Sequence, residues 1–150
     1  MPEESATPDL VGLTSRMFEA PGGAAFSQAA VVDTFSAFYA PDVVWESVGL
    51  GTTFKGLEAS REFLEDWMAR FEDYEIEIEE ILDLGGGVVF VKSAHAGRPI
   101  GSPAHVRLPR EVLVNVFVWE RGLITHVVSS GDTPPARAAA ERLAQERAQG

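Results

Sequence analysis

Four polar side chains stand among apolar neighbours in this sequence and could do chemistry: Glu46, His95, Asn115 and His126. Glu46 follows the apolar run Val43 to Trp45, so we expect its carboxylate at the end of a buried strand. An apolar pocket raises the pKa of a carboxyl group towards the range that suits a general base or acid. The alternative is that Glu46 is a solvated turn residue, or that it pairs with Arg61.

Asn115 is the only polar residue between Val112 and Trp119. A buried amide needs hydrogen-bond partners, so it either donates to an oxygen of a ligand or is satisfied by backbone groups or water. On a regular strand, Leu113, Phe117 and Trp119 share its face. We therefore expect these three residues to bind the ligand as cavity lining, with Asn115 orienting it.

The two histidines would face the same cavity if their strands alternate regularly. His126 would then lie on the face of Ile124 and Val128, which makes Val128 another ligand-binding candidate. His95 would point inward if Lys92 points to solvent. Each imidazole could donate a hydrogen bond or carry a proton, and the alternative for each is a satisfied core histidine. A β-bulge would reverse the alternation.

The elements that must position these residues follow from apolar periodicity. Helical spacing predicts helices over residues 8–20, 24–39 and 57–71, and the third should place Trp67 and Phe71 at the pocket wall. A short strand over 42–47 separates the last two helices, with a turn over 48–53. Four further segments read as strands: 74–84, 88–96, 105–120 with a bend near Pro109, and 123–130.

This order predicts one α+β domain over residues 10–132. A flexible tail, 1–9, precedes it, and a tail that could be helical, 133–150, follows it. Helix, short strand, helix and then several long strands fit a cone-shaped α+β fold better than a parallel βαβ fold.

The sequence resembles the SnoaL-like branch of the nuclear transport factor 2-like superfamily. The resemblance rests on Tyr-Ala-Pro-Asp-Val-Val-Trp-Glu, on Phe-Lys-Gly before the third helix, on Glu-Ile-Glu-Glu-Ile-Leu-Asp-Leu-Gly, on Gly-Arg-Pro and on Trp-Glu-Arg-Gly-Leu-Ile. It implies a strongly bent, antiparallel or mixed sheet wrapped on three helices, with a deep apolar cavity and often a dimer formed through the sheet. The superfamily includes ketosteroid isomerases, polyketide cyclases, epoxide hydrolases, dehydratases and transport adaptors.

The resemblance also implies roles for two residues. Glu46 falls where similar isomerases carry a proton-shuttling Asp, and Asn115 falls where they place the protonated Asp of the oxyanion hole. The sequence departs from the active members of the family in two ways. The first helix offers only Met17 and Phe18 where the isomerases carry a tyrosine donor. The sequence also lacks the Asp-Arg-Asp set that the epoxide hydrolases use.

Three hypotheses of function follow. The first is a cofactor-independent isomerase, cyclase or dehydratase that acts on a small, largely apolar molecule, with Glu46 as base and Asn115 and His126 orienting the substrate. The second is a protein that binds such a molecule without chemistry. The third is an interaction domain in which the sheet forms a dimer and the cavity is vestigial. The histidines and Glu46 show no ligand-spacing motif, so neither a metal nor another cofactor is predicted.

Composition excludes several other classes. The net charge of −11 disfavours nucleic acid and anionic membranes as partners, since both need clustered Lys and Arg. The chain has no cysteine, and it shows no signal-peptide pattern or long apolar run, so a cytoplasmic location is expected. Because three helices cannot cover both faces of a bent sheet, we expect the outward valines to be buried in a homodimer: Val112, Val114, Val116 and Val118.

Overall fold

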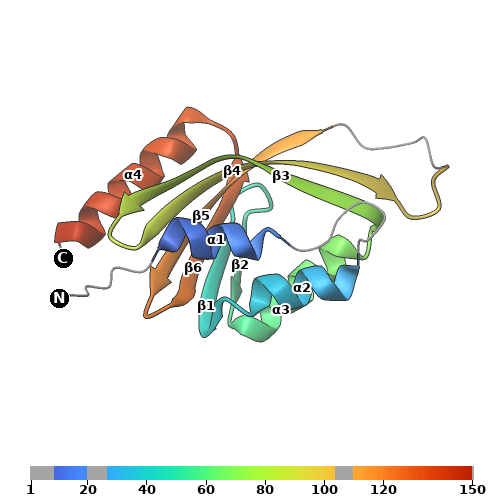
Figure 1. The fold of residues 1–150 in the computed structure, drawn as a ribbon, viewed down its shortest axis with the longest axis horizontal. Helices are drawn as coiled ribbons and strands as arrows, with labels where there is room; N and C mark the ends of the chain where they lie inside the picture. Colours follow the sequence, from blue (N-terminus) through green and yellow to red (C-terminus); the bar gives the residue numbers. More distant parts are fainter. Residues whose placement is uncertain (1–8, 20–26, 104–109, 150) are drawn as a thin grey trace.

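A six-stranded, curled sheet forms the centre of the computed structural model, which describes residues 9–19, 27–103 and 110–149 (Figure 1). The strand order is β2-β1-β6-β5-β4-β3, and only the β1–β6 pair is parallel. The strands are β1 (Tyr39–Ser47), β2 (Thr52–Lys55), β3 (Phe71–Gly85), β4 (Val88–Pro99), β5 (Glu111–Glu120) and β6 (Leu123–Gly131). This confirms the predicted α+β fold class.

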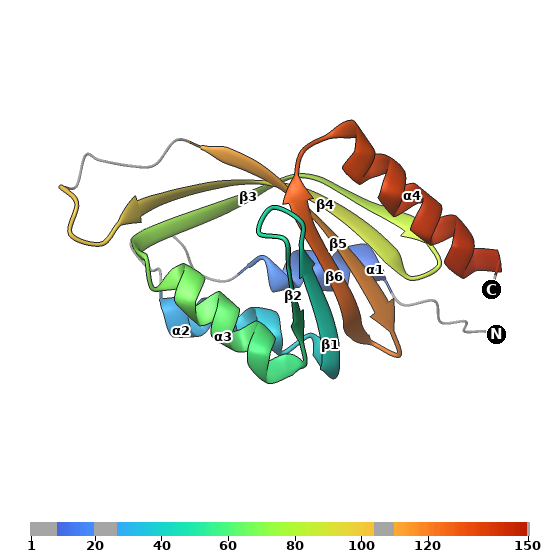
Figure 2. The same ribbon diagram turned by 180° about the vertical axis from the view of Figure 1, so that it is seen from behind.

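Three helices cover one face of the sheet and a fourth covers the other (Figures 1 and 2). The helices are α1 (Leu10–Met17), α2 (Gln28–Ser36), α3 (Leu57–Met68) and α4 (Pro134–Gln149). The first two begin with side-chain caps: Asp9 accepts a hydrogen bond from the amide of Gly12, and Ser27 accepts one from the amide of Ala30. Such caps satisfy backbone donors that a helix start would otherwise leave unpaired.

The apolar side chains of the sheet form two separate layers. The inner layer joins the sheet to α1, α2 and α3 and includes Val43, Phe117 and Val127. The outer layer joins the sheet to α4. Strand alternation divides neighbouring residues between these layers, so the face on which a side chain lies decides which of the two environments it meets.

Helix α4 changes the prediction about the outer valines. Val114, Val116 and Val118 are buried beneath Ala140 and Ala144 of this helix. The two alanines let the helix backbone approach the sheet closely, which explains why a helix with one large apolar residue can cover it. The reason given for burying these valines in a homodimer was therefore wrong; the homodimer itself stays a prediction.

Several helix and strand boundaries differ from those predicted. Helix α2 ends at Ser36, and Tyr39, expected at the end of that helix, begins β1. The irregular stretch between Tyr39 and Val44 accommodates Pro41 in this strand. Helix α3 ends at Met68, because Phe71 already pairs with Pro99 in the sheet. The expected start of the fifth strand, together with the bend at Pro109, lies outside the described residues.

The sequence analysis missed two short features, a strand and a tight turn. Strand β2 lies inside and beyond the segment expected to be a turn, and it pairs with β1 from Ser47 to Val44. The tight turn between β5 and β6 consists of Arg121 and Gly122, both with positive φ. That backbone conformation is the one that matches the twist of a two-residue hairpin.

Candidate functional site

A cavity of about 400 Å³ lies between the inner face of the sheet and helices α2 and α3. Eight of its lining residues are aromatic: Phe18, Phe35, Tyr39, Trp45, Phe63, Trp67, Tyr74 and Phe117. Leu50, which is 60% exposed, and Gly49 lie at its mouth. A concave, mostly apolar space with a few polar groups is the usual form of a small-molecule site.

One group of polar side chains lies across three neighbouring strands of the cavity floor. Ser47 of β1 is paired in register with Ser129 of β6, and Ser129 is paired with Asn115 of β5. Trp45 Nε1 donates to Ser129 Oγ at 2.7 Å, and that hydroxyl donates to Asn115 Oδ1. No hydrogen bond within the described residues uses the amide nitrogen of Asn115. This nitrogen is therefore a donor that a ligand could use.

A second polar group surrounds His95. Its Nδ1 lies 2.7 Å from the hydroxyl of Tyr74, and its Nε2 lies 2.8 Å from the hydroxyl of Ser93, which is fully buried. Trp67 Nε1 donates to the Tyr74 hydroxyl over 3.4 Å. Both ring nitrogens of His95 are thus engaged, which fixes the orientation of the imidazole against the cavity wall.

Burial sets the protonation of this group. Desolvation lowers the pKa of His95 to about 4, so its imidazole is neutral at neutral pH. Desolvation also raises the pKa of Tyr74 to about 12, with a smaller contribution from the charge of Glu111. Burial likewise raises the pKa of Tyr39 above its ordinary range. The cavity therefore presents neutral phenols and a neutral imidazole.

Glu111 is the one acidic residue that lines the described part of the cavity. It is exposed, begins β5 and is paired in register with His95 of β4. No hydrogen bond or ion pair of its carboxylate occurs within the described residues. The carboxylate that the sequence reading assigned to the cavity at Glu46 is thus supplied at its mouth by Glu111.

The prediction that Glu46, Asn115 and His126 converge on one cavity was wrong. In β1 the side chains of Trp45 and Ser47 face the cavity, so Glu46 between them points to the outer face. His126 lies opposite Val118 of the outer layer, and its Nε2 forms a hydrogen bond with Glu46 Oε2. Of the three polar residues, only Asn115 lines the cavity.

A bulge explains the misplacement of His126 and Val128. The pairing of β5 with β6 shifts between Val118 and Trp119, so that Thr125 is an additional residue in β6. Ile124 and Val127 therefore both enter the inner core, while His126 and Val128 lie on the outer face. The extra residue reverses the alternation that would have placed His126 in the cavity.

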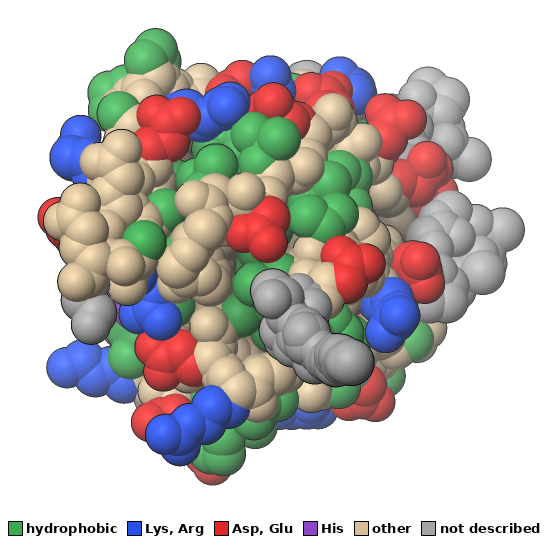
Figure 3. Space-filling view, turned by 60° about the vertical axis from the view of Figure 1, so that its left-hand side comes forward, with side chains coloured by type: hydrophobic (Ala, Val, Ile, Leu, Met, Phe, Trp, Pro, Cys, Tyr) green, Lys and Arg blue, Asp and Glu red, His purple; other side chains and the backbone are tan. Residues whose placement is uncertain are grey.

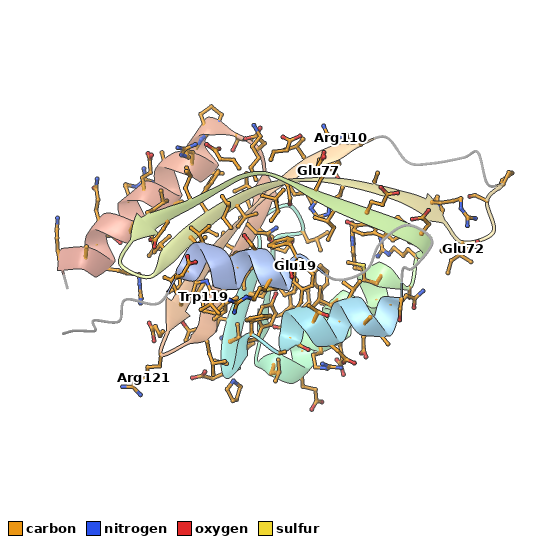
Figure 4. The ribbon with its side chains drawn as sticks, viewed as in Figure 1. Glu19, Glu72, Glu77, Arg110, Trp119 and Arg121 are labelled. Atoms are coloured by element: carbon orange, nitrogen blue, oxygen red, sulfur yellow. The ribbon has the colours of Figure 1, made fainter. Side chains whose placement is uncertain are left out.

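The remaining predicted residues divide into two sets. Four line the cavity: Trp67, His95, Leu113 and Phe117. Two do not. Phe71 lies in the inner core beside an open depression near Gln28, and Trp119 lies against α1, where its Nε1 donates to the buried hydroxyl of Thr14 at 3.1 Å (Figure 4). Trp119 shares the face of Asn115, as predicted, but lies beyond the end of the cavity.

Sequence reasoning missed six polar residues of the described lining: Tyr39, Ser47, Tyr74, Glu111, Ser129 and Ser130. Tyr74 precedes Ile76 and Ile78 in strict alternation, so its inward direction could have been read from the pattern. Tyr39 was hidden by the helical spacing of the residues before it. Glu111 gave no signal, because it follows Arg110 and resembles part of a solvated ion pair.

The described residues form neither a candidate metal site nor a candidate membrane-spanning helix. Within the described ranges, no three His, Asp or Glu side chains come together in a way that could hold a metal ion. No helix in that part of the chain is long and apolar enough to cross a membrane. On the face shown in Figure 3, acidic and basic side chains are interspersed with hydrophobic ones.

The fold is shared with several solved structures. A protein of ketosteroid isomerase-like fold from Catenulispora acidiphila, solved in complex with trimethylamine, is 16% identical with a TM-score of 0.63, over 83% of this chain and 86% of that one. A proposed SnoaL-like polyketide cyclase from Jannaschia is 17% identical with a TM-score of 0.66, over 92% and 97%.

An epoxide hydrolase from M. tuberculosis is 19% identical with a TM-score of 0.61, over 91% of this chain and 92% of that one. At these identities the likeness concerns the fold alone. A search of curated proteins finds no match. The sequence profile of the SnoaL-like domain, in contrast, matches residues 23–127, which is more than half of the chain. The chain therefore belongs to the SnoaL-like domain family.

Proposed function

We propose that the cavity binds a small, largely apolar molecule that carries a hydrogen-bond acceptor such as a carbonyl or hydroxyl group. The observation that carries this proposal is a pair of hydrogen-bond donors on an aromatic wall that have no partner among the described residues. Asn115 and Tyr39 both line the cavity, and neither the amide nitrogen of Asn115 nor the hydroxyl of Tyr39 forms a hydrogen bond within the described residues. A ligand that supplies acceptors would give both donors a partner inside the cavity.

The aromatic wall supplies affinity and the polar floor supplies orientation. Burial of a ligand's apolar surface contributes roughly 25 cal/mol per Å². The chain from Trp45 through Ser129 to Asn115 holds the amide in one direction, since each member donates to the next. A ligand acceptor would therefore meet a donor whose position is already fixed.

Catalysis by proton transfer is the second candidate, and the Tyr74–His95–Ser93 group is the observation that favours it. A neutral imidazole that orients a phenol is suited to donating a hydrogen bond to a carbonyl oxygen on which charge develops. Glu111, whose charge acts on Tyr74, would be the carboxylate base in this scheme. Glu46 has no part in it, because it lies on the opposite face of the sheet.

A calorimetric comparison of two probes tests the binding proposal. Methyl naphthyl ketone and isopropenylnaphthalene have nearly the same shape, and only the ketone carries an acceptor. We expect the wild-type chain to bind both and Asn115→Leu to lower its preference for the ketone by about fivefold, the value of one hydrogen bond. Glu46→Gln should change neither affinity, because that side chain lies outside the cavity.

A second pair of variants tests the place of binding. Leu113→Trp adds a ring inside the cavity, whereas Val112→Trp makes the same change on the neighbouring residue of the other face. Only the first should abolish binding of isopropenylnaphthalene. Equal affinities in both variants would contradict the proposal.

A further inference from the structure

The only charge among the described residues that line the cavity is negative. Among the described lining residues there is no Lys or Arg, and the single charged residue is Glu111. Since His95 is neutral at neutral pH, no positive charge faces a ligand from the described lining. An anionic ligand would thus lose its hydration without gaining a cation in return.

Within the described residues, no cation pairs with the carboxylate of Glu111, and the neighbouring Arg110 is engaged elsewhere. Arg110 forms ion pairs with Glu77, at 3.2 Å, and with Glu79. Figure 4 shows Arg110 and Glu77 on the side of the sheet away from α1 and α2. Arg110, which precedes β5, pairs with these glutamates of β3 and is therefore directed away from the cavity that Glu111 lines.

The aromatic wall can also attract a cation. The negative face of an indole or phenol ring draws in ammonium groups, and the attraction increases as water is excluded. Trp67 already shows this property, because the guanidinium of Arg70 lies 5.2 Å from the centre of its ring. Tyr74 and Glu111 both line the cavity, and the charge of the carboxylate acts on the phenol.

On the basis of the proposed function, we propose that the cavity selects amines. The ammonium group of the ligand lies at the mouth between Glu111 and Tyr74, and its apolar part lies inside against the aromatic wall. The net charge of −11 on the whole chain acts in the same direction, because it raises the concentration of cations near the surface. Glu111 is the residue that determines this specificity.

The test uses two probes of the same shape. Phenyltrimethylammonium and tert-butylbenzene differ only in the replacement of a positively charged nitrogen by carbon. Calorimetry gives the ratio of their affinities for the full-length chain and for Glu111→Gln, which keeps the size of the side chain and removes its charge. We expect the ratio to fall by about fivefold in Glu111→Gln, the effect of one partly solvated ion pair, while the affinity for tert-butylbenzene stays the same.

Glu120→Gln is the matched control. Glu120 ends the same strand, is exposed and pairs with Arg147, so this variant changes the net charge equally without touching the cavity. The ratio should equal that of the wild-type chain. An equal fall in both variants would overturn the role of Glu111, since it would show an effect of total charge.

The remaining outcomes separate this inference from the function on which it rests. If tert-butylbenzene binds and phenyltrimethylammonium does not, the selection of amines is wrong and the apolar cavity stands. If the ratio is the same in wild type and Glu111→Gln, the selection is likewise overturned. If neither probe binds the wild-type chain, the proposed function fails and this inference fails with it.

Discussion

At the scale of the residue, a position one step along a strand decides whether a side chain can act in the cavity. Glu46 and Ser47 are neighbours, yet Ser47 lines the cavity and Glu46 pairs with His126 on the outer face. Both the apolar run before Glu46 and the motif resemblance pointed to Glu46, and neither took account of the alternation that turns Trp45 and Ser47 inward. The direction of a side chain follows from the pleat of its own strand.

His95 makes the folded state sensitive to acid. Its pKa is lowered to about 4 in the folded chain, against about 6.5 when unfolded, so the unfolded state binds a proton first as the pH falls. Stability should therefore decrease through this window as the pH is lowered. Between about pH 7.5 and about pH 5 we expect a loss of about 2 kcal/mol due to this residue.

Urea unfolding of the wild-type chain and of His95→Gln measures this contribution. Gln keeps hydrogen-bonding capacity towards Tyr74 and Ser93 but does not titrate, and all carboxylates are common to both chains. The difference between their unfolding free energies should change with pH by the stated amount. A constant difference would show that the pKa of His95 is the same in the folded and unfolded chains.

At the scale of the element, most of the fold could be predicted and its irregularities could not. The apolar periods of Phe63, Leu64 and Met68, or of Ile76 and Ile78, arise from burial on one side and so appear directly in the sequence. The additional residue at Thr125 and the irregular stretch after Tyr39 leave no such period. They depend on pairing between strands that lie far apart in the chain. The candidate site was misread at these places.

The packing of helix α4 on the sheet can be tested by measuring the free energy of unfolding. Ala140 is buried against the outer layer and the adjacent Ala139 is exposed, so Asp at either position has the same intrinsic helix propensity but a different environment. We expect Ala140→Asp to lower the free energy of unfolding by about 3 kcal/mol, because it buries an unpaired charge. Ala139→Asp should cost less than about 1 kcal/mol in the same urea titration. Similar losses would show that α4 is not packed on the sheet.

At the scale of the whole molecule, α4 occupies the surface from which a homodimer was predicted. The homodimer stays a prediction, and light scattering at micromolar concentration measures it. We expect a chain ending at Thr133 to form larger assemblies than the full-length chain, since loss of α4 exposes Phe90, Val114 and Val116. Circular dichroism would verify that the shortened chain keeps its sheet. Equal masses for the two chains would contradict this expectation.

Two of the three tryptophans line the cavity and the third does not, which has a practical consequence for detecting ligands. Trp45 and Trp67 line the cavity, whereas Trp119 is fixed to Thr14 in the core beyond it. Indole emission responds to the polarity and to the quenching groups around the ring. A molecule that enters should therefore change the fluorescence of two tryptophans and leave the third as an internal reference. Intrinsic tryptophan fluorescence can therefore be used to screen a library of unlabelled compounds for binding.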